Sequence, residues 1–224
     1  KDSQTAQTIL MVRPSAFGFN EETAKTNVFQ SRDGNLGDDE LQRLAVSEFD
    51  VFVKELRSAN VDVIVCQDRL EPQTPDAIFP NNWISMHHDG TVVLYPMSVP
   101  SRRLERRVDI VETLQQEYKF EVSRVVDLTD YENQSRFLEG TGSLVFDYPG
   151  RCIYANISAR TDEIVLHELR DLFNHDLVLF RATDSFGRDI YHTNVVMSIG
   201  EGFVVICAEA IDDIAERDYV VGKL

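Results

Sequence analysis

The chain has 224 residues, of which 43% are hydrophobic, and its 38 acidic residues outnumber its 22 basic ones to give a formal net charge of −16. This length fits one large domain or at most two small ones, and we expect a single domain over residues 1–224. A surface of this charge repels phosphate backbones and anionic membranes, which argues against nucleic-acid binding, and no apolar run approaches the roughly 20 residues of a membrane span.

The first predicted elements are a strand, a helix and a second strand. The apolar run "ILMVRP" (9–14) is typical of a buried strand, and "VDVIVC" (61–66) is typical of another. A helix is predicted over 37–60, with Asp38 and Asp39 at its positive N-terminus. The spacing of its apolar residues predicts a buried face made of Leu41, Leu44, Ala45, Phe49, Phe52, Val53 and Leu56.

A strand–turn–strand pattern then occurs three times. It is found in "NNWISMHHDGTVVLYPM", "GTGSLVFDYPGRCIYANIS" and "HTNVVMSIGEGFVVICAEA". The predicted turns are at Asp89–Gly90, Pro149–Gly150 and Gly200–Gly202. The patterns begin about 50 to 60 residues apart, and a period of this size indicates a repeat architecture built from one supersecondary unit.

Each hairpin is followed by a predicted helix, and the first two helices lead to a further strand. Ser101 is the expected N-cap of "SRRLERRVDIVETLQQEY", and Thr161 is the expected N-cap of "TDEIVLHELRDLF". The strands after them are "VSRVVDL" and "DLVLFRA". This order of hairpin, helix and strand predicts an α/β fold of ββαβ units. We expect "SRRLERR" to form a solvated helix face, and His87 and His88 to lie at a solvated hairpin tip without a metal role.

Polar residues stand at the start of every hairpin, in "FPNN", "LEGTG" and "YHTN". In a pseudo-symmetric ring of such units, equivalent positions converge near the central axis. We therefore expect Asn82, Glu139 and His192 to meet in one site. The alternative is that these residues form ordinary turns before strands.

Three segments resemble the signature segments of the guanidino-group-modifying enzymes, or penteins: "TPDAIFPNNW", "FLEGTGSLVFDYPGRCIYANISARTD" and "YHTNV". This superfamily includes arginine deiminases, dimethylarginine dimethylaminohydrolases and amidinotransferases. The segments "ILMVRPSAFGFNEETAKTNVFQ" and "YPMSVPSRRLERR" resemble the citrulline-hydrolysing branch most. The resemblance covers nearly the whole chain. It implies a pentein-type α/β propeller of five pseudo-symmetric ββαβ units, here incomplete at the C-terminus.

The resemblance also implies a chemistry, in which a cysteine thiolate attacks the central carbon of a guanidinium or related group. His192 then matches the proton shuttle, and Glu139 matches the acidic residue of the second signature segment. Asp76 matches a substrate-binding acid, and Arg160 matches the arginine that holds the substrate α-carboxylate. A small amino-acid substrate is implied, with no metal and no cofactor.

The sequence departs from the family pattern in three places. Gly140–Ser143 stands where the family usually has Gly-Gly-Asp after its acid, and Asn194 stands where deiminases have an acid. The family's nucleophilic cysteine lies in a Gly-rich segment near the C-terminus, and none of Cys66, Cys152 and Cys207 has that context. We therefore expect the nucleophile and the fifth unit to be missing from these residues.

The cysteines are odd in number and form no CxxC pair, which makes a disulfide framework or a zinc site improbable. The N-terminal "KDSQTAQTIL" has no apolar signal region. We expect a reduced, cytoplasmic protein that binds neither nucleic acid nor membrane, and leave open whether it forms a homo-oligomer.

Asn81 and Asn82 stand where many relatives carry carboxylates. A guanidinium has only donors and favours carboxylates, whereas the neutral ureido group of citrulline also has a C=O acceptor. An Asn amide serves both kinds of partner. The leading interpretation is a citrulline hydrolase that forms ornithine, ammonia and carbon dioxide, with Asn81, Asn82 and Asn194 around the ureido group. The alternatives are a turn role for the Asn pair, an arginine or substituted-arginine deiminase or dihydrolase, and a non-catalytic binding module.

Overall fold

The structure is a computed structural model that describes residues 3–27, 29–30 and 36–224. Its residues gather in two compact units. Unit 1 comprises Lys1–Thr5, Asn81–Ser98 and Val122–Leu224, and unit 2 comprises Ala6–Pro80 and Val99–Glu121. The expectation of a single domain over the whole chain stays a prediction.

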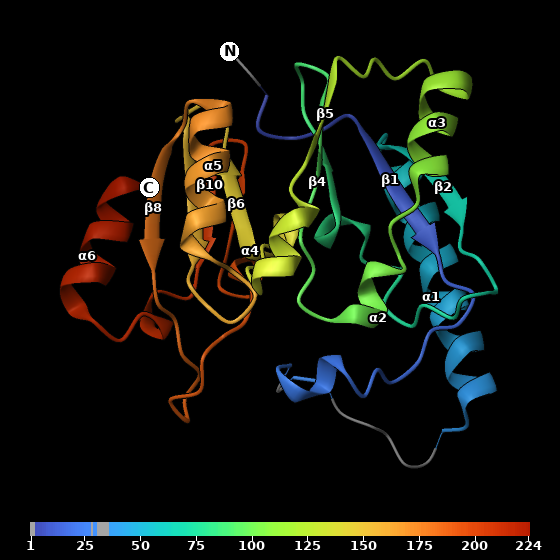
Figure 1. Ribbon diagram of the computed structural model, residues 1–224, viewed down its shortest axis with the longest axis horizontal. Coiled ribbons are helices and arrows are strands. Elements are labelled where there is room, and N and C mark those ends of the chain that lie inside the picture. Colours follow the sequence, from blue (N-terminus) through green and yellow to red (C-terminus); the bar gives the residue numbers. More distant parts are fainter. Residues whose placement is uncertain (1–2, 28, 31–35) are drawn as a thin grey trace. The chain divides into compact units, whose positions relative to one another are not determined.

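Unit 2 is built on a pair of parallel strands, β1 (Thr8–Arg13) and β2 (Asp62–Gln67), in the register Thr8↔Asp62. The helix α1 (Asp38–Ser58) connects them and packs along them (Figure 1). Its first turn carries acidic residues, as expected from the favourable interaction of carboxylates with a helix N-terminus. The order strand–helix–strand was therefore predicted correctly.

The buried face of α1 is narrower than predicted. Phe49 and Val53 are buried and pack with Val63 of β2, but Leu44 and Phe52 are 41% and 55% exposed. Positions 49 and 53 lie one turn apart on the stripe that faces the strand pair, whereas 44 and 52 lie to one side of it. A two-stranded sheet covers only a narrow stripe of its helix, so the prediction was wrong for these two residues.

The segment after the first hairpin forms two helices in place of the one expected. They are α2 (Pro100–Arg103) and α3 (Val108–Glu117). Val99 is the N-cap of α2 and Pro100 occupies its first turn, a position that suits the fixed φ of proline, so Ser101 does not cap. The expected solvated face is also wrong in part. Arg102 is 3% exposed and forms a two-pronged ion pair with Glu105, itself 4% exposed.

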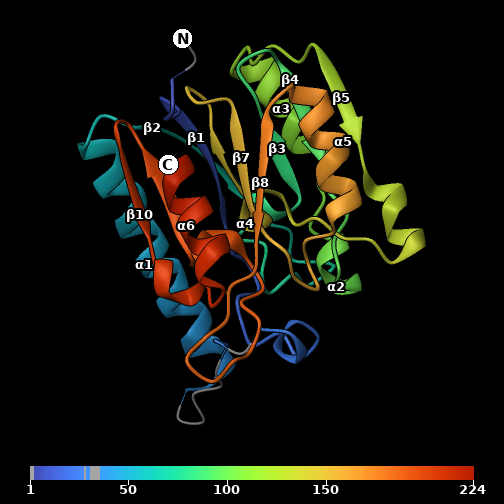
Figure 2. The same cartoon turned by 90° about the vertical axis from the view of Figure 1, so that its left-hand side faces the viewer.

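Unit 1 contains three sheets, visible in Figures 1 and 2. Their strands are β3 (Ile84–Met86), β4 (Thr91–Leu94) and β5 (Arg124–Asp127); β6 (Leu144–Asp147), β7 (Cys152–Asn156) and β8 (Asp176–Phe180); and β9 (Met197–Gly200) and β10 (Phe203–Ile206). The helices are α4 (Gly140–Ser143), α5 (Glu163–Phe173) and α6 (Ile214–Lys223). Short 3₁₀ turns cover Thr23–Lys25, Pro80–Asn82, Thr129–Gln134, Thr193–Val195 and Ala208–Ala210.

The predicted repeat is present in the strand pairing. Each of β3–β4, β6–β7 and β9–β10 is an antiparallel hairpin, and β5 and β8 then pair in parallel with β4 and β7. The α/β class is therefore confirmed. Figures 1 and 2 show α5 lying along β8. Asp162, not Thr161, caps α5, because its carboxylate accepts a hydrogen bond from the Ile164 amide.

The core of unit 1 packs one helix face against the second sheet. Val165, Leu166 and Leu169 of α5 are fully buried against residues such as Phe146 and Ile153. The third hairpin packs in a second cluster of buried residues, which includes Val196 and Met197 together with Tyr154 and Val178. No helix in the described ranges combines the length and the apolar character that a bilayer crossing needs.

His87 is buried, contrary to the expectation of a solvated hairpin tip, whereas His88 is exposed. The Nε2 atom of His87 lies 2.7 Å from the Ser85 hydroxyl, and its Nδ1 lies 3.2 Å from the Tyr148 hydroxyl. The ring also packs against Phe173, with ring centroids 4.2 Å apart. Burial disfavours the imidazolium and lowers the pKa of His87 from 6.5 to about 4.

This burial makes stability depend on pH. Below pH 6.5 His87 becomes protonated in the unfolded chain, whereas in the folded chain it stays neutral until the pH approaches about 4. The free energy of unfolding should therefore fall by about 3 kcal/mol as the pH drops through this window. Urea unfolding at pH 7 and pH 4.5 should show a smaller loss in His87→Gln than in the wild type. His88→Gln is the matched control, and an unchanged loss in His87→Gln would contradict the assignment.

Candidate active site

The candidate site belongs to unit 1, at the starts of its three hairpins. Asn82 ends the 3₁₀ turn before β3, and the buried Trp83 anchors that turn in the core. Glu139 is the residue before α4, and His192 is the residue before the 3₁₀ turn that leads to β9. Each side chain thus sits where an irregular segment meets a strand pair, held by a rigid scaffold.

Glu139 is the centre of the cluster. Its side chain is fully buried, and its Oε2 accepts hydrogen bonds from His192 Nε2 at 2.9 Å and from Arg160 Nη1 at 3.3 Å. Its Oε1 accepts a bond from the Ser98 amide at 3.1 Å. A buried carboxylate without such partners would be strongly destabilising. These bonds therefore supply partners to both oxygens of the buried carboxyl group and hold the imidazole of His192 in a fixed orientation.

The orientation identifies the ring nitrogen of His192 that is able to accept a proton. A carboxylate only accepts, so Nε2 carries the proton of this bond, and in the neutral ring Nδ1 is the atom able to accept a proton. Nδ1 faces Gly142: a Cβ added there would lie 2.7 Å from it. The same Cβ would lie 2.4 Å from Asn82 Nδ2. Asn82, Glu139 and His192 therefore do come together, around a glycine.

A second glycine lets the chain pass closely by the Asn pair. Gly140 has φ +44°, and a Cβ there would lie 2.1 Å from the backbone oxygen of Asn81. Both the left-handed backbone and this approach require glycine. Asn81 is half-buried, and Asn194 is exposed on the 3₁₀ turn after His192. Their contact with a ureido group stays a prediction.

Arg160 and Asp76 have partners of their own. The Arg160 guanidinium is 2% exposed, bonds Glu139 and lies over the ring of Tyr191, 4.7 Å from its centroid. Asp76 belongs to unit 2, where it accepts a hydrogen bond from Asn20 at 2.8 Å and lies 3.8 Å from Arg102. The substrate contacts expected of Arg160 and Asp76 stay predictions.

Sequence reasoning missed the polar groups that support these residues. Tyr191 stacks on Arg160, and the hydroxyls of Ser143, Ser158 and Thr193 bond to the backbone around the cluster. All four lie inside or beside the quoted signature segments. Their closeness in sequence to Glu139, Arg160 and His192 is the signal that could have identified them. The spacing of residues along the chain does not, however, predict which backbone groups their hydroxyls bond.

The described cysteines differ in their surroundings. Burial raises the pKa of the Cys66 thiol in unit 2 and of the Cys152 thiol on β7, whereas Cys207 is exposed. A nucleophilic cysteine needs a lowered pKa, so Cys66 and Cys152 lack the property that activates a thiolate. Within the described ranges, no group of three or more His, Cys, Asp or Glu side chains is arranged to hold a metal ion.

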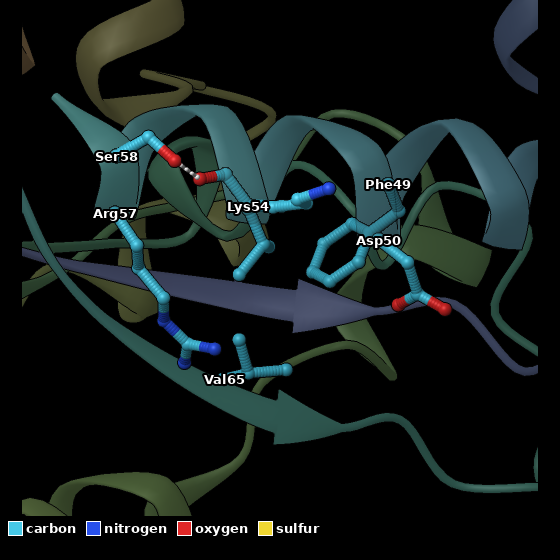
Figure 3. A pocket seen from close by; sticks show the side chains of 7 residues that line it. Phe49, Asp50, Lys54, Arg57, Ser58 and Val65 are labelled. Atoms are coloured by element: carbon cyan, nitrogen blue, oxygen red, sulfur yellow. Dashed lines mark hydrogen bonds between the residues drawn. The ribbon is translucent and has the colours of Figure 1, made fainter.

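A hollow in unit 2, between α1 and β2, contains none of the predicted site residues (Figure 3). Two of its charged groups are already engaged. Asp50 pairs with Arg13 at 2.7 Å, and Arg57 donates to the Val63 carbonyl at 2.9 Å. The cluster around Glu139 can instead move a proton at His192 Nδ1 and bind a polar group at the Asn82 amide. It is the better candidate for chemistry.

Comparison with known proteins gives one family match and several similar structures. A family model described as eukaryotic N,N dimethylarginine dimethylhydrolase matches residues 13–224. A search of curated proteins found no match.

Two similar solved structures are of ArgZ, an arginine dihydrolase from cyanobacteria. Its N-terminal domain, bound to substrate, is 18% identical over 96% of this chain and 72% of that chain, with a TM-score of 0.68. Apo ArgZ is 17% identical over 97% of this chain and 28% of that chain, with a TM-score of 0.64. The present chain thus spans well under half of the whole ArgZ chain.

A third similar structure is DDAH from Pseudomonas aeruginosa, in a mutant complexed with citrulline. It is 14% identical over 94% of this chain and 73% of that chain, with a TM-score of 0.64. At identities this low, all three likenesses establish a shared mixed α/β fold.

Proposed function

Since the chain belongs to the family of the eukaryotic N,N-dimethylarginine dimethylhydrolases, we propose that it is a hydrolase acting on the central carbon of a ureido or guanidino group, with citrulline as its substrate. Membership of this family confirms the resemblance to the guanidino-group-modifying enzymes. We further propose that its α/β units belong to a pentein-type propeller.

The observation that carries the proposal is the hydrogen bond between His192 and Glu139, with the Asn82 amide beside it. The bond leaves His192 Nδ1 as the proton acceptor, on the side of the ring where Asn82 lies. In the proposed reaction His192 Nδ1 takes the proton of the cysteine thiol, the thiolate attacks the ureido carbon, and His192 gives that proton to the departing amine. His192 then takes a proton from water, and the resulting hydroxide displaces the remaining carbamoyl group from the thiolate as carbamic acid, which decomposes to ammonia and carbon dioxide. Citrulline and one water give ornithine, ammonia and carbon dioxide.

The preference for a ureido group rests on the charge of the site. Glu139 is already matched by Arg160 and by His192, so its charge is not available to balance an arginine guanidinium. Asn81 and Asn82 are neutral. A guanidinium placed against two amides would lose its hydration without gaining a carboxylate partner. The neutral ureido group meets no such cost, and an amide offers it both a donor and an acceptor.

The nucleophile of the proposal is a cysteine thiolate. Cys66 and Cys152 are unsuitable because burial raises the pKa of both thiols. The family resemblance points to a cysteine in a Gly-rich segment C-terminal to these signature segments. The role of the described residues is therefore to bind the ureido group and to move its protons.

A second candidate is hydrolysis of arginine or a substituted arginine. It is favoured by what the relatives are described as: an arginine dihydrolase and a dimethylarginine dimethylaminohydrolase. In that case another carboxylate would have to supply the negative charge that Asn81 and Asn82 do not. The third candidate is a non-catalytic binding module. Such a module would use the polar groups that come together in the site to bind a ligand, and it would need no nucleophile.

The test is a substrate comparison on the full-length protein. Citrulline, arginine and dimethylarginine are supplied separately, and ornithine, citrulline and ammonia are followed. We expect ornithine from citrulline, with arginine left largely untouched. Citrulline formed from arginine or dimethylarginine, without ornithine from citrulline, would support the second candidate. Binding of citrulline without any turnover would support the third.

A variant sharpens this comparison. Asn82→Asp keeps the size of the side chain and adds a negative charge beside His192. It should lower turnover of citrulline and strengthen binding of arginine, because a carboxylate prefers a cation to a neutral ureido group. Asn60→Asp, on an exposed turn of unit 2, is the control for the added charge. Equal effects of the two variants on both ligands would remove Asn82 from the specificity argument.

A further inference from the structure

The backbone that carries His192 is tied to its surroundings by side chains that bind no substrate in the proposed reaction. Thr193, the next residue, is fully buried. Its hydroxyl accepts a hydrogen bond from the Asn156 amide at 2.8 Å and donates one to the Ser143 carbonyl. One hydroxyl thus connects the end of β7, the end of α4 and the segment of His192. Both of these hydrogen bonds go to backbone groups. The Thr193 hydroxyl therefore fixes the positions of backbone segments and not the conformation of another side chain.

Ser143 makes the corresponding link on the side of Glu139. Its buried hydroxyl accepts from the Glu139 amide at 3.0 Å and donates to the Arg160 carbonyl at 2.8 Å. The two hydroxyls are joined in series, because Thr193 bonds the carbonyl of Ser143 itself. The three residues of the charged cluster, Glu139, Arg160 and His192, are therefore held through one continuous path.

The segment before His192 is held in a similar way. The Asn156 side chain donates to the Ile190 carbonyl at 2.5 Å and accepts from the Ala182 amide at 2.8 Å. The Ser158 hydroxyl donates to the Tyr191 carbonyl at 2.7 Å. With residues 190, 191 and 193 all tied down, the backbone on both sides of His192 is fixed, although His192 lies in an irregular segment.

We propose that Thr193 and Ser143 are positioning residues that set the distance between the His192 imidazole and the Glu139 carboxylate. The proposal rests on the proposed function for its kinetic consequence, since His192 must be in place to shuttle a proton. A displacement of about 1 Å at a reacting group can lower turnover by about 10²-fold. Loss of the Thr193 hydroxyl should lower kcat and leave KM nearly unchanged, because this hydroxyl bonds backbone groups of Asn156 and Ser143 and has no place among the substrate-binding groups of the proposed function.

The experiment compares Thr193→Val, which keeps the shape and removes the hydroxyl, with Thr193→Ser, which keeps the hydroxyl. Thr91→Val is the matched control: Thr91 is equally buried, and its hydroxyl accepts a bond from Arg124 in the first hairpin sheet. All are made in the full-length protein, and melting temperatures establish that each variant is folded. We expect kcat to fall about 10²-fold in Thr193→Val and to be restored largely in Thr193→Ser. Thr91→Val should lose stability without losing turnover.

A second measurement separates this proposal from the proposed function. In protein labelled with ¹⁵N-histidine, the ring signals of His192 are identified by their absence in His192→Ala. They should shift or broaden in Thr193→Val and in Ser143→Ala, and stay in place in Thr91→Val. If the wild type turns over no substrate, the proposed function fails and these signals alone decide on positioning. If Thr193→Val is folded and the His192 signals are unchanged, the proposal that Thr193 positions His192 is overturned, whatever the kcat of the variant.

Discussion

Replacing His192 by Ala should lower turnover by about 10²–10⁴-fold, the usual contribution of a general acid–base group. The imidazole donates a hydrogen bond from its Nε2–H to Glu139 and presents Nδ1 on the side of Asn82, so His192 is the group of the described cluster that can accept a proton at that position. The measurement is kcat on citrulline in the full-length protein, together with the melting temperature of the same sample.

The fold should survive this change. Glu139 keeps its bonds to Arg160 and to the Ser98 amide, so its buried charge stays compensated. His167→Ala, a partly exposed histidine on α5, is the control and should leave turnover unchanged. If His192 were only a packed core histidine, His192→Ala would unfold at a lower temperature and its remaining folded molecules would turn over normally. That outcome removes His192 from the mechanism.

Gly142→Ala is expected to be the most damaging of the small substitutions. The added methyl group would lie 2.4 Å from Asn82 Nδ2 and 2.7 Å from the ring of His192, distances that real Cβ atoms essentially never show. Asn82 and His192 must both move, and the ring then leaves its 2.9 Å bond to Glu139. A misplacement of this size should lower kcat by about 10²-fold.

Gly222→Ala is the matched control, because nothing lies within 4 Å of the position that its Cβ would occupy and alanine favours the helix α6. It should keep full turnover and melt at the same or a slightly higher temperature. The kinetic comparison is made on folded protein, checked by circular dichroism. Normal turnover in Gly142→Ala would mean that the close packing of Asn82 and His192 around Gly142 has no part in the reaction.

The repeat of the chain was readable from sequence because its signals are local. Alternating apolar runs joined by short turns specify hairpins, and helical periodicity follows each of them. All three hairpins, α1 and α5 were predicted for this reason. A helix was also predicted over 101–118, but its division into α2 and α3 was not, because the ion pair of Arg102 and Glu105 at this division is buried only by tertiary packing. His87 was misplaced for a related reason: Phe146 of β6 and Phe173 of α5 pack against its ring.

The cluster divides in the same way. Its residue types were given by motif: a carboxylate in "LEGTG", an imidazole in "YHTN" and amides in "FPNN". We expected these residues to lie together because they occupy matched positions in the repeats. The specific hydrogen bonds and contacts among them were not expected. Tertiary structure alone decides that Glu139 bonds Arg160 as well as His192, that Gly142 separates Asn82 from the ring, and that Thr193 and Ser143 tie the segments together. Those contacts join residues up to 60 positions apart in the chain (Asn82 and Gly142), and a periodic pattern along the chain carries no information about which side chains meet across it.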